Sequence, residues 1–285
     1  DPVAGTNTNF QLIRTATDVE LWSGVVITVT PAGAIQVDRP TGATKVAFGD
    51  VNVIQYVSVN GNGGSDNLVI DYTGVAGLED VSVAFAGGGA LTNSGLYLSG
   101  GTFGRVEYAY LNAHDGLIGN FDDAAGTTLR SLVFYTGLAP ITNTGTVTDV
   151  VFDLPTSGNV QAILEDDGTT GNTLTRLRSN PVAFEQTDFA NPSGTVTINR
   201  GSATDDLRIN AVPDFTAGLT IGEGTAPFDQ LTVAGAMTLA GDKNLTGDAT
   251  SIEISGGSTA VALSGNGAAT LTAVQKISMT GGATL

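Results

Sequence analysis

The chain has 285 residues, 28 acidic against 11 basic side chains, a formal net charge of -17, and no cysteine. This charge excludes a surface that attracts nucleic acid or anionic membranes, and the lack of cysteine excludes disulfides and thiolate metal sites. No apolar run reaches the roughly 20 residues of a membrane span, so direct membrane insertion is not expected.

Residues 1–24 are the least regular part of the chain, and we expect them to form an N-terminal cap. A stack of repeated units has to cover the exposed edge and core of its last layer. Trp22, the single tryptophan, is expected to pack in this cap rather than to contact a sugar.

Residues 45–72 contain short apolar alternations, typical of strands, on either side of a glycine-rich turn. Within this block, residues 61–69 resemble the calcium-binding nonapeptide of repeats-in-toxin proteins, with Asn62 in place of the second glycine. The resemblance implies calcium held by the Asp66 carboxylate and by loop carbonyls. Its further ligands would be the carbonyls of Gly61, Gly63 and Ser65, with Asp71 or Asp50 from adjoining segments. One copy of the nonapeptide is present, whereas that family uses consecutive copies.

Residues 111–129 are expected to form an inserted loop, because the spacing of apolar pairs becomes looser there. This segment carries His114, the single histidine. One histidine and no cysteine exclude a His-based metal cluster and a Cys-His nucleophile. No Gly-x-Ser-x-Gly elbow is present that would give His114 a serine partner, so we interpret it as a solvated residue.

Residues 191–285 have the most regular pattern in the chain. Pairs of apolar side chains, separated by one polar position, begin at nearly equal intervals at Val196, Leu207, Leu219 and Leu231. Residues i and i+2 of a strand share one face, so each pair points inward while the residue between points outward. The intervening Gly, Asn, Asp, Ser and Pro favour turns.

A strand this short cannot bury a face by itself, so the units must stack into an all-β solenoid. The interval from Leu231 to Ile252 is followed by a slightly longer interval from Ile252 to Ile277. One coil is therefore expected to take about 21–25 residues, which is within the range of known solenoid repeats, and to contain two or three strands. We expect a single continuous stack over residues 1–285. The chain ends inside an apparent repeat, which favours a piece of a longer protein.

The segments 45–72 and 185–285 resemble the repeat regions of very large secreted surface proteins of planctomycete-like bacteria. These are similar to the β-helices of adhesins and autotransporter passengers. The resemblance is carried by residues 189–199, 205–209 and 214–221. It implies a right-handed parallel β-helix, export, and a role in adhesion or in the outer cell layer.

Two functions of different classes remain open from the sequence. The first is a non-catalytic, extracellular structural or adhesive protein of the cell surface, with surface or matrix polymers or other copies of itself as partners. The second is a polysaccharide hydrolase or lyase that uses carboxylates on the flank. An enzyme is not expected, because neighbours on a strand point to opposite faces and a doublet alone cannot flank one bond. The enzyme would require a groove with converging acids and a tyrosine for sugar stacking; the candidates are Asp122–Asp123, Asp166–Asp167 and Asp205–Asp206, with Tyr108, Tyr110 or Tyr135.

Overall fold

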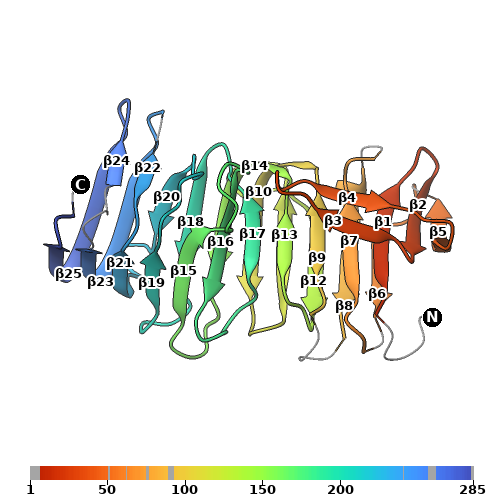
Figure 1. Cartoon of the computed structure of the whole chain (residues 1–285), viewed down its shortest axis with the longest axis horizontal. Coiled ribbons are helices and arrows are strands. Elements are labelled where there is room, and N and C mark those ends of the chain that lie inside the picture. Colours follow the sequence, from red (N-terminus) through yellow and green to blue (C-terminus); the bar gives the residue numbers. More distant parts are fainter. Residues whose placement is uncertain are drawn as a thin grey trace. The chain divides into compact units, whose positions relative to one another are not determined.

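The computed structural model describes residues 7–50, 52–61, 63–74, 77–88, 93–239, 241–255 and 261–283. These residues form strands, turns and one short 3-10 helix, and the described part contains no α-helix. The predicted all-β class is confirmed, and most strand pairs are parallel (Figure 1). No helix of the described residues is long and apolar enough to cross a membrane.

The chain divides into two compact units, which we name unit 1 (residues 1–106 and 114–146) and unit 2 (residues 107–113 and 147–285). The single continuous stack expected over residues 1–285 stays a prediction, since the two units are established separately. β10 (Thr102–Tyr110) contributes to both. The other elements of unit 1 are β1 (Asn9–Arg14), β2 (Asp18–Ser23), β3 (Val26–Val29), β4 (Ile35–Asp38), β5 (Thr44–Asp50), β6 (Tyr56–Asn60), β7 (Asn67–Asp71), η1 (Leu78–Asp80), β8 (Ser82–Ala86), β9 (Leu96–Ser99), β11 (Gly116–Phe121), β12 (Leu129–Thr136) and β13 (Ile141–Asn143).

Two parallel ladders build unit 1. In the first, β6, β8 and β12 stack so that Val57 pairs with Val83 and Val83 with Val133. In the second, β1, β7, β9 and β13 stack in the same sense. The alternating burial of β8 follows from its sequence, because Val83 and Phe85 point inward while the residues between them do not.

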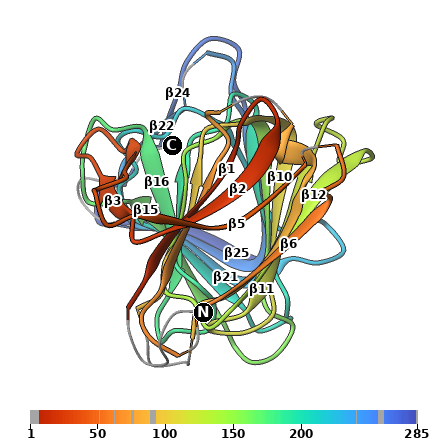
Figure 2. The same cartoon turned by 90° about the vertical axis from the view of Figure 1, so that its right-hand side faces the viewer.

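The first strands of unit 1 lie where the cap was predicted. β1 lies on β7 in parallel and pairs on its other edge with β2, which is antiparallel and pairs in turn with β5 (Figure 2). Phe10, Leu12 and Val19 are buried under these strands. Of the predicted cap, residues 1–6 lie outside the described residues.

Residues 111–129 are not a loop throughout, and this part of the prediction is wrong. β11 lies within them and pairs antiparallel with β12, with Ile118 opposite Val133. Both of these side chains are fully buried. The inserted element is therefore the first strand of a β-hairpin and the turn that follows it.

Unit 2 is the more regular stack. The inward pairs predicted from Val196 to Val233 are all no more than 1% exposed, while Arg208 between two of them is exposed. The strands of unit 2 after β10 are β14 (Thr146–Asp153, whose first residue belongs to unit 1), β15 (Gln161–Asp166), β16 (Leu174–Ser179), β17 (Thr187–Ala190), β18 (Thr195–Asn199), β19 (Asp206–Ile209), β20 (Gly218–Ile221), β21 (Phe228–Val233), β22 (Met237–Leu239), β23 (Leu245–Ser255), β24 (Val261–Leu263) and β25 (Ala269–Thr280).

The register of unit 2 repeats at nearly constant spacing. Leu231 pairs with Ile252, and Ile252 pairs with Ile277. Leu219 pairs with Leu245 in the neighbouring ladder. Both intervals expected from the sequence, from Leu231 to Ile252 and from Ile252 to Ile277, are confirmed as strand pairings. The antiparallel pairs β15–β16 and β16–β17 interrupt this pattern on one flank.

Candidate functional site

The residue at the centre of the predicted calcium turn, Asp66, is fully buried at the corner before β7. Its Oδ1 accepts the Thr8 N–H at 2.7 Å, and its own N–H donates to Ser94 Oγ at 3.0 Å. Thr8 precedes β1 and Ser94 precedes β9, the two strands stacked on either side of β7. Asp66 therefore joins its corner to the corners of both neighbouring strands.

Of the remaining predicted ligands, Gly61 lies against Asp66. A Cβ added to Gly61 would lie 2.3 Å from Asp66 Oδ2, so the glycine backbone is packed against the carboxylate. Gly63 has a φ of 91°, and Ser65 donates its N–H to Asn7 at 2.9 Å. Asn62 lies outside the described residues.

The two outlying acids named for this site are used elsewhere. Asp71 accepts from Gln11 Nε2 at 2.6 Å and from Thr73 Oγ1 at 2.6 Å. Asp50 accepts the Asn52 N–H at 2.8 Å. Asp71 therefore joins β7 to β1, and Asp50 closes its own turn.

Asp66 Oδ2 is buried without a hydrogen-bond partner among the described residues. Burial raises the pKa of Asp66 above its ordinary value of 3.8, against the lowering effect of the Thr8 and Gly64 N–H groups. A buried carboxylate with one free oxygen favours its protonated form, because desolvation penalises the charge.

Stability should depend on pH through this residue. Because the pKa of Asp66 is raised in the folded protein, the folded protein takes up a proton at a higher pH than the unfolded chain does. Asp66 therefore adds stability as the pH falls from that pKa toward about 3.8, compared with its contribution at pH 7. We expect the native protein to gain stability relative to Asp66→Asn, which does not titrate, when urea unfolding is compared at pH 7 and pH 4. A difference between the two proteins that is independent of pH would contradict the raised pKa.

The corner role of Asp66 recurs in unit 2. Asp205 is fully buried before β19. Its Oδ1 accepts the Val160 N–H at 2.9 Å from the corner before β15, and its Oδ2 accepts two N–H groups of its own turn. Asp149 likewise accepts the Thr195 N–H at 2.7 Å. These aspartates are parts of the scaffold, each accepting a backbone N–H from a neighbouring layer.

Two of the three aspartate doublets are engaged in contacts with nearby residues. Asp123 closes its own turn, where hydrogen bonds from Thr127 and Thr128 lower its pKa to about 2. Asp122 Oδ1 lies 3.5 Å from Arg130 Nη1. In the second doublet, Asp166 accepts the Gly168 N–H and Asp167 accepts the Thr169 N–H. The described residues hold no group of three His, Asp or Glu side chains placed to bind a metal ion.

The tyrosines named for sugar stacking are buried. Tyr108, Tyr110 and Tyr135 are between 0% and 3% exposed. Tyr108 stacks on Phe152 with ring centroids 4.9 Å apart, and Tyr110 stacks on Phe184 at 4.6 Å. These rings belong to the core, so they cannot offer a stacking face to a ligand in this structure.

His114 and Trp22 both have partners within unit 1. His114 Nδ1 lies 2.9 Å from the Leu138 carbonyl oxygen, so the residue is held against the chain and is not simply solvated. Trp22 donates to Glu20 at 2.8 Å, and the Arg39 guanidinium lies 4.4 Å from its ring centroid. The expectation that Trp22 packs in the cap agrees with these contacts.

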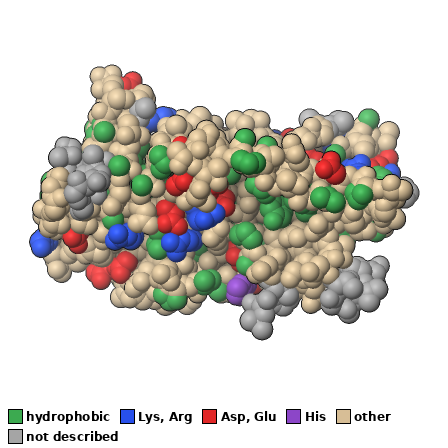
Figure 3. All heavy atoms as spheres, in the orientation of Figure 1, with side chains coloured by type: hydrophobic (Ala, Val, Ile, Leu, Met, Phe, Trp, Pro, Cys, Tyr) green, Lys and Arg blue, Asp and Glu red, His purple; other side chains and the backbone are tan. Residues whose placement is uncertain are grey.

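A row of charged side chains on the flank of unit 2 was not foreseen from the sequence. Arg176 binds Asp188 through two hydrogen bonds of 2.7 and 2.8 Å, and Arg178 donates to Glu165 at 2.5 Å. Figure 3 shows acidic and basic side chains gathered on one face. These oppositely charged side chains pair across the antiparallel strands β15, β16 and β17. The spacing of Arg176 and Arg178 in the sequence indicates that both side chains lie on one face of a strand. Their acidic partners could not be predicted, because these depend on the antiparallel register.

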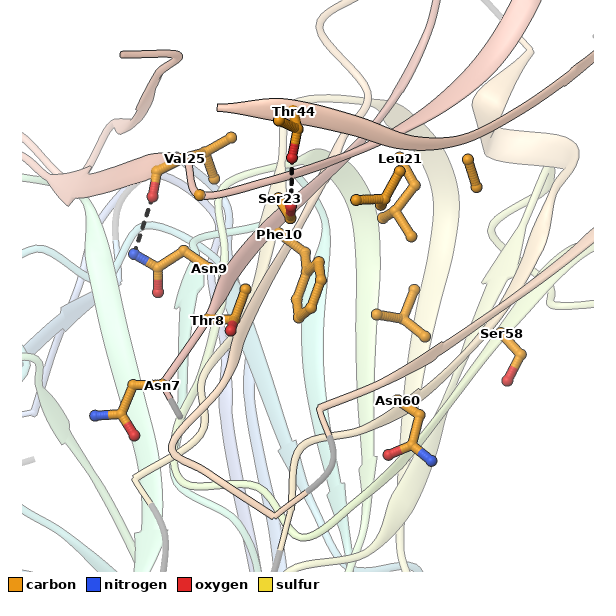
Figure 4. Close-up of a pocket in the computed structure, with 14 residues that line it drawn as sticks. Asn7, Thr8, Asn9, Phe10, Leu21, Ser23, Val25, Thr44, Ser58 and Asn60 are labelled. Carbon is orange, nitrogen blue, oxygen red and sulfur yellow. Dashed lines mark hydrogen bonds between the residues drawn. The ribbon is translucent and has the colours of Figure 1, made fainter. Parts of the chain in front are cut away.

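Unit 1 contains a groove of about 840 Å³ (Figure 4). It lies between β6 on one side and β1, β2 and β5 on the other, and the described residues that line it are uncharged. Phe10 points into it from β1, and Ser58 and Asn60 line it from β6. Its size falls in the range of binding clefts, about 300–1,000 Å³.

Comparison with protein-family models, with curated proteins and with solved structures finds no match for this chain. The resemblance to bacterial surface repeats therefore stays a prediction, and no family membership is shown.

Proposed function

We propose that the chain is part of a right-handed parallel β-helix that serves as a non-catalytic, extracellular structural or adhesive element of a bacterial cell surface or matrix. The observation that carries the proposal is the repeated register of unit 2, where Leu207, Leu231 and Ile252 pair in succession along one ladder. Each layer contributes inward aliphatic side chains and outward polar ones. Such a stack presents an extended, regular surface rather than a single pocket.

The contacts of the polar side chains support a structural role. Asp66, Asp149 and Asp205 each accept a backbone N–H from a neighbouring layer. Arg176 and Arg178 are paired with acids. Charged groups that are already engaged in this way contribute to the scaffold and are poorly placed to act as acid and base.

The charge of -17 suits a long β structure. Acidic side chains keep a long β structure soluble and discourage contact between its flanks. Surface or matrix polymers, or other copies of the chain, are the proposed partners.

The proposal predicts binding without cleavage. The purified chain should be retained on immobilised bacterial cell-surface polysaccharide and should release neither reducing ends nor unsaturated products from acidic polysaccharides. Asp122→Ala combined with Asp123→Ala should leave retention unchanged, because the Asp123 side chain closes its own turn and the Asp122 side chain faces Arg130. Product release that this double change abolishes would overturn the proposal in favour of an enzyme.

Calcium at the Asp66 corner is a proposal of its own. Calcium takes six to eight oxygen ligands at about 2.3–2.6 Å, and the free, buried Oδ2 of Asp66 is one oxygen that fits. The described residues hold no group of three His, Asp or Glu side chains placed to bind an ion there. The resident ion would therefore depend on carbonyls of the turn.

Thermal melting with and without calcium tests this site. We expect calcium to raise the melting temperature of the native protein and to have a smaller effect on Asp66→Asn. The net charge of -17 attracts calcium non-specifically, so Asp229→Asn, which removes a charge from an exposed residue, is the matched control. An equal calcium shift in all three proteins would remove Asp66 from the site.

A further inference from the structure

Another hollow of unit 1, of about 500 Å³, lies on the flank where the stacked strands β6, β8 and β12 begin. Gln55 precedes β6, Ser82 is the first residue of β8, and Arg130 is the second residue of β12. Arg14, the last residue of β1, and Asn52, in the turn after β5, also line it. Its size falls within the range of ligand sites. Three successive layers of one ladder therefore contribute polar side chains to a single hollow.

Arg14 brings an unused hydrogen-bond donor to this hollow. Its side chain is half-buried, and its buried Nε–H has no hydrogen-bond partner among the described residues. Gly77 holds the guanidinium in place, because a Cβ on this glycine would lie 1.3 Å from Arg14 Nη1. Buried polar groups in folded proteins nearly always have a partner. An acceptor on a ligand in the hollow would supply the partner that the chain does not.

Arg130 lines the same hollow and is held by acids. Its Nε donates to Asp80 Oδ1 at 2.8 Å, and its Nη1 lies 3.5 Å from Asp122 Oδ1. Of these two acids, Asp80 also lines the hollow. The described lining therefore carries two positive charges against one negative charge, in a chain of net charge -17. This local excess of positive charge favours an anionic ligand.

The neutral side chains of the lining indicate what else the ligand carries. Ser82 Oγ accepts the Leu132 N–H at 3.1 Å, so the hydroxyl proton of Ser82 can be donated to another group. The exposed amides of Gln55 and Asn52 can both donate and accept. Such groups hydrogen-bond to sugar hydroxyls, while a guanidinium matches a planar carboxylate with two parallel hydrogen bonds. A ligand with one carboxylate and several hydroxyl groups uses all of them.

We propose that this hollow binds one hexuronic acid unit of an acidic polysaccharide. The Arg14 guanidinium donates to the carboxylate, and Asn52, Gln55 and Ser82 hydrogen-bond to the hydroxyl groups of the same sugar. The proposal rests on the surface role above and names the class of matrix polymer that the surface binds. The ligand is held without cleavage, since the acid beside it, Asp80, is paired with Arg130.

Isothermal titration calorimetry with D-glucuronate, at about 0.15 M salt, tests this site. The screening length at this salt concentration is about 8 Å, so the distant acids of the chain add little repulsion. We expect the native protein to bind D-glucuronate at least about tenfold more tightly than D-glucose, which has no carboxylate for Arg14. This comparison of ligands uses the native protein alone, so it does not depend on the folding of any variant.

Two changes at Arg14 separate its geometry from its charge. Arg14→Gln should weaken D-glucuronate binding about tenfold or more, because it removes a charged donor. Arg14→Lys keeps the charge but loses the planar fork, so it should weaken the binding too. Arg208→Gln makes the same change of charge at an exposed residue of unit 2 outside the hollow, and it should bind as the native protein does. Circular dichroism verifies that each variant is folded.

Equal affinity for D-glucuronate and D-glucose would overturn the proposal, as would D-glucuronate binding that Arg14→Gln leaves unchanged. Inorganic sulfate or L-glutamate that binds as tightly as D-glucuronate would indicate a site for simple anions or for a peptide carboxylate, and would also overturn it. Retention on immobilised polysaccharide is a separate result. If the native protein and Arg14→Gln are retained equally, this hollow is not the site and the proposed surface role stands, whereas a native protein that is not retained contradicts that role itself.

Discussion

Ile221→Asp should unfold unit 2, with a loss of stability of about 3–5 kcal/mol or more. Ile221 is 0% exposed and lies between Ile198 and Gly247 in its ladder. An aspartate there has no partner, and burial of an unpaired charge is the most costly change available at this position. Urea unfolding followed by circular dichroism measures the effect.

Thr220→Asp is the matched control for this experiment. Thr220 lies on the same strand but points outward between Thr197 and Thr246, so an acid there should change stability by less than about 1 kcal/mol. A soluble, fully folded Ile221→Asp protein with an unchanged urea midpoint would show that the inward and outward faces are reversed.

Phe152→Ala should cost about 3–5 kcal/mol, the usual range for loss of a buried aromatic side chain. Phe152 is 0% exposed and lies 4.9 Å from the Tyr108 ring and 5.0 Å from the Phe189 ring, measured between centroids. The alanine would leave a cavity among rings that the backbone ladder holds in place.

Phe134→Ala supplies the comparison, because Phe134 is 42% exposed on β12. Its loss removes less buried area and should cost less than about 1 kcal/mol by the same urea measurement. Equal losses for the two variants would mean that the aromatic stack adds nothing to the core.

The regular ladders were predictable because strand periodicity and turn chemistry point to the same arrangement. Leu207 and Ile209 share a face, and the polar turn at residues 200–205 returns the chain to the next strand. Asp205 shows why this turn is specific, since its carboxylate accepts three backbone N–H groups. The pairing of Leu231 with Ile252 then follows from the coil length.

Strand direction could not be predicted in the same way. Leu174 and Leu177 of β16 carry no sign of strand direction in the sequence, and β16 is antiparallel to β15 and β17. Direction depends on how far the connecting turn carries the chain, and a pattern of side chains along one strand does not record this. The ion pair of Arg176 with Asp188 was missed for the same reason.

The candidate sites were the least predictable part. Tyr108 and Tyr110 were named as sugar-stacking residues, but their alternate spacing places both on the inward face of β10. Asp66 was named as a calcium ligand, and the structure also gives it a bond to Thr8 that sequence spacing could not indicate. Contacts between residues so far apart in the chain depend on the stacking itself.

The most direct test of the stacked-coil account uses the register between neighbouring layers. Thr197 and Thr220 are partners in the parallel pairing of β18 with β20. The chain has no cysteine, so Thr197→Cys with Thr220→Cys introduces a single pair of thiols, and the distance between adjacent strands, about 4.8 Å, lies within disulfide range.

The account predicts that this pair forms a disulfide within one chain under mild oxidation. The control pair, Thr197→Cys with Thr232→Cys, joins strands of different ladders and should stay reduced. A disulfide in the control pair and none between positions 197 and 220 would contradict the stacked register.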